Sequence, residues 1–196
     1  MQEKRQRIGL LFGSFNPIHI GHTALANYIL EYSNLYEIWF VVSSQNPFKN
    51  KSELMPETLR YEMVKTAIAK EPRFSVSDIE FHLPQPSYTI NTLEKLTLEY
   101  PHYEFAVIIG SDNLSDLSKW KESEKLICSY RFIVYPRPNY PVKDAELPVN
   151  FEIIEAPLLN ISSTMIRKSI KDGKQLSFLM PAGVYELMMK NNSQLS

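Results

Sequence analysis

The sequence has 196 residues, a length at which one domain buries roughly 70% of the surface of its unfolded chain without a disulfide or structural metal. Apolar residues make up 44% and charged residues 22%, which excludes the disordered and fibrous classes. The net charge of −1 excludes a general attraction to nucleic acid or to an anionic membrane, so local groups would have to hold any anionic ligand. We expect one domain over residues 1–196, with residues 190–196 as a flexible tail.

Strand-like and helix-like segments alternate along the chain. The strand-like segments are short, apolar and bounded by Gly, Pro or polar residues. They lie at 7–13, 36–43, 73–81, 103–110, 130–138 and 151–157. Helical spacing of apolar residues, with Pro or capping residues at the ends, predicts helices at 20–32, 56–71, 87–101, 163–172 and 182–190.

The first two helices have predicted inner faces, formed by Leu25, Ile29 and Tyr32 and by Leu59, Met63 and Ala67. Parallel strands need long crossover connections, and helices between strands supply them. The expected fold class is therefore α/β: a doubly wound, Rossmann-like parallel sheet with helices on both faces.

The location in the cell is predicted from two features. No apolar run is long enough to span a bilayer, and the N-terminal segment reaches glycine and polar residues too soon for a secretory leader. The single cysteine, Cys128, lies in the helix-like stretch SEKLICSYRF, cannot form an internal disulfide, and is expected to be a buried structural thiol. We expect a cytoplasmic protein with no membrane partner.

The stretch GSFNPIHIGH follows the first strand, at the carboxyl end where ligands of such sheets bind. Gly13 permits close backbone approach, and the N–H groups of Ser14 and Phe15 lie near a helix N-terminus that favours an anion. His19 and His22 are three residues apart and share a helix face, so both imidazoles can point at one phosphate. Metal ligation and a core or capping role are the alternatives for the two histidines.

A second stretch, ISSTMIR at 161–167, lies about 140 residues downstream. Ser162, Ser163 and Thr164 are good N-cap and first-turn residues that can also hold phosphate oxygens. Arg167 lies about one turn further on and can make a bidentate contact. Helix capping alone would explain the Ser-Ser-Thr run, but it would not explain its pairing with HIGH.

Together these stretches resemble the signature of the nucleotidylyltransferase superfamily, whose (T/H)xGH motif reads HIGH here. Within it, the chain resembles the nicotinate-nucleotide adenylyltransferases of NAD synthesis over nearly its whole length. The segments PSYTINTL (86–93), IIGSDNLSDLSKW (108–120) and YPRPNYP (135–141) are similar to that family's pattern, and NPFKN (46–50) matches it in part. Three residues depart from the pattern: Asn16 for Asp, Phe48 for His and Asn139 for Gly.

The resemblance implies the following site. His19, His22, Lys49 and Arg167 would be catalytic; ATP would bind Gly13, Ser14, Phe15, His22, Gly110, Asp112, Ser162, Ser163, Thr164 and Arg167; and nicotinate mononucleotide would bind Ser14, Phe15, Lys49, Tyr88, Thr89, Thr92, Trp120 and Arg137. Asp112 would hold the adenosine ribose, and Trp120 would stack on the pyridine ring. Packing by Trp120 and helix capping by Asp112 are the structural alternatives.

The implied reaction is adenylyl transfer from ATP to the mononucleotide with loss of pyrophosphate. Mg²⁺ would be the cofactor and would arrive mainly with ATP, without a metal site of the protein's own. The partners would be ATP and a pyridine mononucleotide, and not a nucleic acid. A nicotinamide-mononucleotide or phosphopantetheine adenylyltransferase and a non-catalytic nucleotide sensor are the alternatives; the oligomeric state stays open, a homo-oligomer included.

Overall fold

The computed structural model describes residues 5–44, 54–142 and 147–191, and within them six strands pair in parallel to form one sheet. The strands are β1 (Gln6–Gly13), β2 (Glu37–Val42), β3 (Phe74–Ser77), β4 (Tyr103–Gly110), β5 (Arg131–Tyr135) and β6 (Phe151–Ile153). Their order in the sheet is β3-β2-β1-β4-β5-β6. The first three strands are added in sequence toward one edge, and β4, β5 and β6 are then added on the other side of β1. This is the doubly wound arrangement, and it confirms the predicted fold class.

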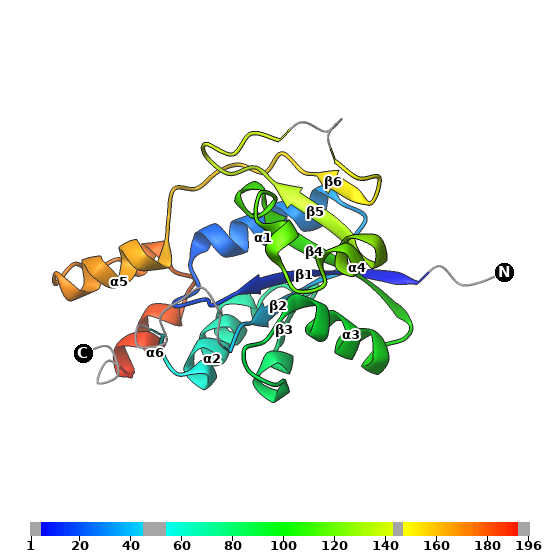
Figure 1. Ribbon diagram of the computed structural model, residues 1–196. Helices are drawn as coiled ribbons and strands as arrows, with labels where there is room; N and C mark the ends of the chain where they lie inside the picture. The colour runs from blue at the N-terminus through cyan, green and yellow to red at the C-terminus, as the bar shows by residue number, and fades with distance from the viewer. Residues whose placement is uncertain (1–4, 45–53, 143–146, 192–196) are drawn as a thin grey trace.

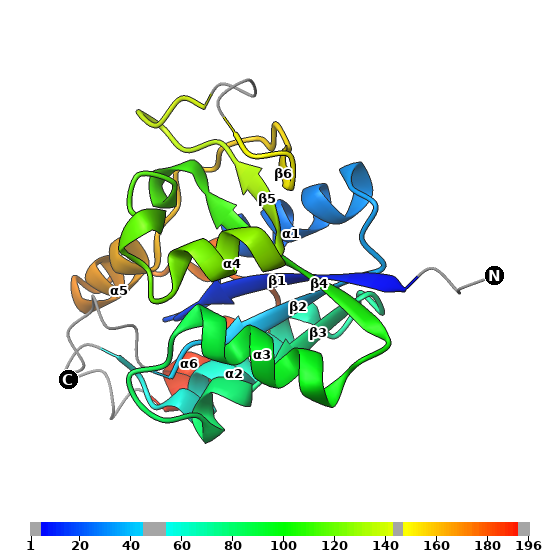
Figure 2. The same ribbon diagram turned by 45° about the vertical axis from the view of Figure 1, so that its right-hand side comes forward.

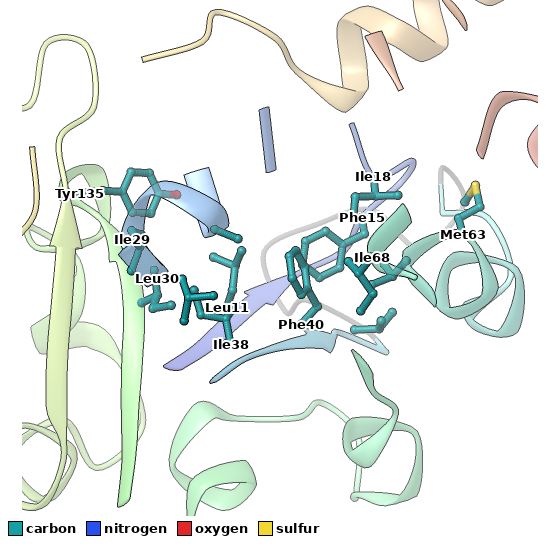
Figure 3. Packing of buried hydrophobic residues seen from close by; sticks show 14 of the residues in the cluster. Leu11, Phe15, Ile18, Ile29, Leu30, Ile38, Phe40, Met63, Ile68 and Tyr135 are labelled. Carbon is teal, nitrogen blue, oxygen red and sulfur yellow. The ribbon is translucent and has the colours of Figure 1, made fainter. Parts of the chain in front are cut away.

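Helices cover both faces of the sheet (Figures 1 and 2). They are α1 (Ile20–Tyr32), α2 (Glu57–Ile68), α3 (Thr89–Glu99), α4 (Ser123–Ser129), α5 (Ser163–Lys171) and α6 (Val184–Lys190). Because side chains alternate along a strand, Leu11 and Phe40 face α1 and α2, whereas Leu10 and Val107 face α3 and α4. Figure 3 shows Phe15 packed near Phe40 in the first of these two layers.

The carboxyl end of the sheet is marked in Figure 1 by the head of the β1 arrow. In both views α5 and α6, the last two helices of the chain, stand near that end. The first and last thirds of the sequence therefore meet where the sheet can bind a ligand. None of the helices in the described ranges is long and apolar enough to cross a membrane.

Three predicted strands are much shorter than expected, and short 3-10 helices were not foreseen. The segment 130–138 is a strand only from Arg131 to Tyr135. The segment 73–81 is a strand only to Ser77, because Ile79–His82 turn as a 3-10 helix that buries Ile79 and Glu80. The segment 151–157 is a strand only to Ile153. Further 3-10 helices lie at Ser111–Asn113, Leu117–Lys119 and Ser177–Leu179.

Some predicted side-chain positions are wrong. Tyr32 is 67% exposed at the end of α1, where the buried residues are Ala26, Ile29 and Leu30. Cys128 is exposed on α4, because the buried position of this short helix is Leu126. The last helix ends at Lys190 as predicted. The predicted tail falls mostly on residues 192–196, outside the described ranges, and stays a prediction.

The inner face of α2 is also shifted from its prediction. Met63 is buried as expected, but its buried companions are Arg60, Val64 and Ile68, while Leu59 and Ala67 are only partly buried. Arg60 occupies a buried position of the helical repeat, and a charged residue carries no local signal of burial.

Arg60 is 1% exposed, and its guanidinium bonds only to main-chain oxygens. Nε donates to Met55 O at 2.9 Å, Nη1 to Ser14 O at 2.7 Å and to Ser43 O at 2.8 Å, and Nη2 to Ser44 O at 3.2 Å. These carbonyls belong to the loop after β1, the loop after β2 and the segment that enters α2. One side chain therefore fixes three segments at the carboxyl end of the sheet.

Replacing Arg60 by Met should lower the free energy of unfolding by about 3 to 5 kcal/mol, because it leaves several buried carbonyls without their donors. Urea unfolding followed by circular dichroism measures this loss. Arg73→Met is the matched control, since Arg73 pairs with Glu31 and Glu71 on the surface, and its loss should be far smaller. Equal losses in the two variants would contradict the role of Arg60.

Candidate active site

The loop after β1 and the N-terminus of α5 lie in direct contact. Ser163 Oγ donates to Pro17 O at 2.9 Å, and Arg167 Nη1 donates to Asn16 O at 2.8 Å. The α5 helix begins as predicted, because Ser162 Oγ accepts the N–H of Met165 at 3.2 Å. The two stretches singled out in the sequence are therefore brought together across about 146 residues of chain.

Gly13 and Phe15 shape the loop through their own packing. Phe15 has a φ of 44°, in the left-handed region, and its ring is buried against Phe40 and against the edge of His22. A Cβ on Gly13 would lie 2.7 Å from that ring. The glycine thus makes room for Phe15 rather than for a ligand, and contact of either residue with ATP would involve the backbone. Such contact stays a prediction.

His19 and His22 stack with ring centroids 3.7 Å apart at the start of α1. The N–H of His19 donates to His22 Nδ1 at 3.2 Å, so in a neutral His22 the proton lies on Nε2, the outer nitrogen. Burial, and secondarily the positive charge of Arg137, lower the pKa of His19 to about 4. With this pKa His19 is neutral at pH 7.

The ends of β4 and β5 contribute a charged pair beside the histidines. Arg137 Nε lies 3.6 Å from Asp112 Oδ1, and a Cβ on Gly110 would come within 2.3 Å of that oxygen and 3.0 Å of that nitrogen. Gly110 thus permits the pair to approach. Burial raises the pKa of Tyr135, which lies under the Arg137 guanidinium at 5.1 Å.

The first turn of α3 forms a separate group with the segment before α4. Tyr88 is the N-cap residue, and no side chain caps the helix N–H groups there. Lys121 Nζ lies 5.0 Å from the centre of the Tyr88 ring, and Trp120 packs with Tyr88 against the same apolar layer. Half-buried Thr89 opens the helix. The predicted pyridine-site residues Tyr88, Thr89 and Trp120 are thus placed close to one end of α3.

Thr92 is held by Glu80, and its predicted place near the pyridine carboxylate stays a prediction. It is fully buried, and its hydroxyl donates to Glu80 Oε1 at 3.1 Å. Direct contact with the substituent of a pyridine ring is not supported by this position. Glu80 itself was missed, because a single acidic residue in a strand-like segment carried no recognisable signal of burial.

Comparison with known proteins shows which family the chain resembles. A family model described as cytidylyltransferase-like matches residues 10–169. A Bacteroides fragilis protein named "Probable nicotinate-nucleotide adenylyltransferase" is 46% identical over 191 residues, which cover 97% of this chain and 95% of that one. A Porphyromonas gingivalis protein of the same name is 50% identical over 174 residues, 88% of each chain.

The chain belongs to the cytidylyltransferase-like family, with the nicotinate-nucleotide adenylyltransferases. Its fold is shared with the Plasmodium falciparum nicotinic acid mononucleotide adenylyltransferase complexed with NaAD, at a TM-score of 0.81 and 24% identity, covering 96% of this chain and 97% of that one. The predicted family is therefore confirmed.

The departures from the family pattern have structural explanations at two positions. Asn16 Oδ1 accepts the N–H of Met55 at 3.0 Å, a bond that an Asp carboxylate would make equally well. Asn139 has a φ of 67°, a conformation that suits Gly and that Asn tolerates better than most residues. Phe48 and the predicted catalytic residue Lys49 lie outside the described ranges.

Magnesium is the cofactor that the family implies. Over the ranges that the structure describes, no three His, Cys, Asp or Glu side chains converge into a metal site. The side chains of His19, His22 and Arg167 beside the phosphate loop present nitrogen atoms, whereas Mg²⁺ prefers oxygen ligands. These residues fit a Mg²⁺ that is held chiefly by nucleotide phosphates.

The low pKa of His19 makes folding depend on pH. An unfolded imidazole titrates near 6.5, so between pH 6.5 and about 4 the unfolded chain binds a proton that the folded chain does not, and stability falls as pH falls through this window. We expect this one group to remove about 3 kcal/mol between pH 7 and pH 4, measured by urea unfolding. His19→Asn should flatten that dependence; an unchanged slope would contradict the assignment.

Proposed function

We propose that this member of the nicotinate-nucleotide adenylyltransferases transfers the adenylyl group of ATP to nicotinate mononucleotide, a step of NAD biosynthesis, in the cytoplasm. The observation that carries the proposal is the direct bonding of the α5 N-terminus to the loop after β1, through Ser163 and Arg167. This contact gathers helix N-termini, imidazoles and a guanidinium around one place, which suits a triphosphate.

The ATP site occupies the end of β1, α5 and the end of β4. His22 would donate from Nε2 to an α-phosphate oxygen, since its Nδ1 is occupied by the N–H of His19. Arg167, with Ser162, Ser163 and Thr164 in the first turn of α5, would hold the leaving pyrophosphate. Asp112 would accept from the ribose hydroxyls, which requires it to loosen its contact with Arg137.

The mononucleotide site lies between that loop and the first turn of α3. Trp120 would stack on the pyridine ring, and the Thr89 hydroxyl and the uncapped N–H groups of α3 would bind its carboxylate. Lys121, which lies against Tyr88, adds positive charge. Arg137 would bind the mononucleotide phosphate, with Lys49 as a second cation.

The chemistry needs no general base. The mononucleotide phosphate is anionic at neutral pH, so one of its oxygens bonds to the α-phosphorus while the bond from that phosphorus to the pyrophosphate oxygen breaks. The protein's task is to align the two anions and to stabilise charge that grows on the phosphate oxygens. When bound, Mg²⁺ would neutralise part of the triphosphate charge. His19 supports this by stacking on His22 and fixing its tautomer.

Pyrophosphate release with ATP, Mg²⁺ and each mononucleotide tests the proposal. We expect turnover with nicotinate mononucleotide and a kcat/KM at least about tenfold lower for the amide, which loses a charge-assisted hydrogen bond and presents an NH₂ to donors. Thr89→Val should narrow the difference. ATP binding without turnover on any mononucleotide would indicate a sensor, and equal use of the two substrates would contradict the preference for the acid.

Replacing His22 by Ala should lower kcat by roughly 10²- to 10³-fold, with a much smaller change in ATP affinity, because the imidazole acts on charge that grows in the transition state. Steady-state kinetics and ATP titration separate the two quantities. His102→Ala is the control, since His102 is exposed among aromatic residues at the opposite end of β4. Near-normal kcat in the His22 variant would assign that histidine a structural role.

A further inference from the structure

The carboxylate of Glu80 is buried between the two halves of the site, and neither half uses it for contact with a substrate in the function proposed above. Glu80 is 4% exposed in the turn after β3. Its Oε2 accepts from Ser87 Oγ at 2.7 Å, and its Oε1 accepts from Thr92 Oγ1 at 3.1 Å. Ser87 and Thr92 flank the first turn of α3, the turn assigned to the pyridine ring.

On its other side Glu80 meets the loop after β2. The N–H of Ser44 and the hydroxyl of Ser43 lie on that side and favour the charged form of the carboxylate, and the charges of Glu80 and Arg60 attract each other. Arg60 in turn holds the carbonyl oxygens of Ser43 and Ser44 and that of Ser14 in the phosphate loop. Glu80 therefore lies against the residues that Arg60 holds by hydrogen bonds, and its charge attracts the Arg60 guanidinium.

The hydrogen-bonding partners of Glu80 define its state. The two side chains bonded to the carboxylate, Ser87 and Thr92, are hydroxyls, which can donate to its oxygens. Burial raises the pKa of Glu80, while these donors oppose the shift. Burying a carboxylate costs free energy of folding. Replacing Glu80 by Gln, a neutral residue of the same shape, therefore tests how the charge affects substrate binding.

We propose that Glu80 is a positioning residue for the mononucleotide half of the site. It fixes the first turn of α3 relative to the phosphate loop, through Ser87 and Thr92 on one side and through Arg60 on the other. A mononucleotide must reach from its pyridine ring to its phosphate, so the separation of these two elements determines how well it fits. The inference rests on the proposed function, because it assigns the α3 turn to the pyridine ring.

Steady-state kinetics of Glu80→Gln test the inference. Gln keeps the shape but replaces one acceptor oxygen by an NH₂ and removes the charge opposite Arg60. We expect the KM for nicotinate mononucleotide to rise roughly 10- to 100-fold, while the KM for ATP stays within about twofold, because misplacing a binding element acts on the ligand that it holds. Glu37→Gln is the matched control: Glu37 accepts from Trp39 Nε1 at 2.9 Å at the amino end of β2, and both KM values should stay unchanged.

A second variant, Ser87→Ala, tests the inference if Glu80→Gln does not fold. Ser87→Ala removes only the 2.7 Å bond on the α3 side and should raise the same KM by a smaller factor. The double variant should resemble Glu80→Gln alone, since both changes break one linkage.

Five outcomes decide whether Glu80 positions the mononucleotide. A selective rise in the mononucleotide KM supports the inference, whether seen in Glu80→Gln or, if that variant does not fold, in Ser87→Ala. Equal rises in both KM values, or a lower melting temperature with unchanged KM values, would overturn it and leave Glu80 a scaffold residue. Active wild type with unaffected variants would refute the inference alone. Wild type that is inactive with mononucleotides would refute the proposed function and this inference with it.

Discussion

The buried guanidinium of Arg60 is the constraint on which the carboxyl end of the sheet depends. Its planar fork donates to four main-chain oxygens on three segments that are distant in sequence, and no other side chain reproduces that set of directions. Glu80 is buried beside Arg60, and the two side chains attract each other. The conformation of the phosphate loop is therefore determined by directional polar contacts as well as by apolar packing.

Opposite charges lie close together at the phosphate end of the site. His19 is neutral because it is buried and near Arg137, and Arg137 is itself close to Asp112. The ligand-free site thus avoids an excess of unpaired positive charge, although it is built for anions.

The two halves of the site are built by different means. The ATP half is assembled from the ends of β1 and β4 and from α5, with short hydrogen bonds across the chain. The mononucleotide half depends on the first turn of α3, whose link to the phosphate loop runs through Glu80, the loop after β2 and Arg60. In the proposed site, different elements therefore bind the ATP phosphates and the pyridine ring of the mononucleotide.

The sequence by itself determined the order of strands and helices, the doubly wound class and the two phosphate motifs, because apolar periodicity, glycine, proline and N-cap residues act over a few neighbouring positions. Only the tertiary structure decided that the Arg60 side chain is buried, that Thr92 bonds to Glu80, and that the Phe15 ring lies against Gly13. Each of these depends on which group a buried polar or aromatic side chain meets. That partner comes from a distant segment, and its direction is set by packing that no local pattern records.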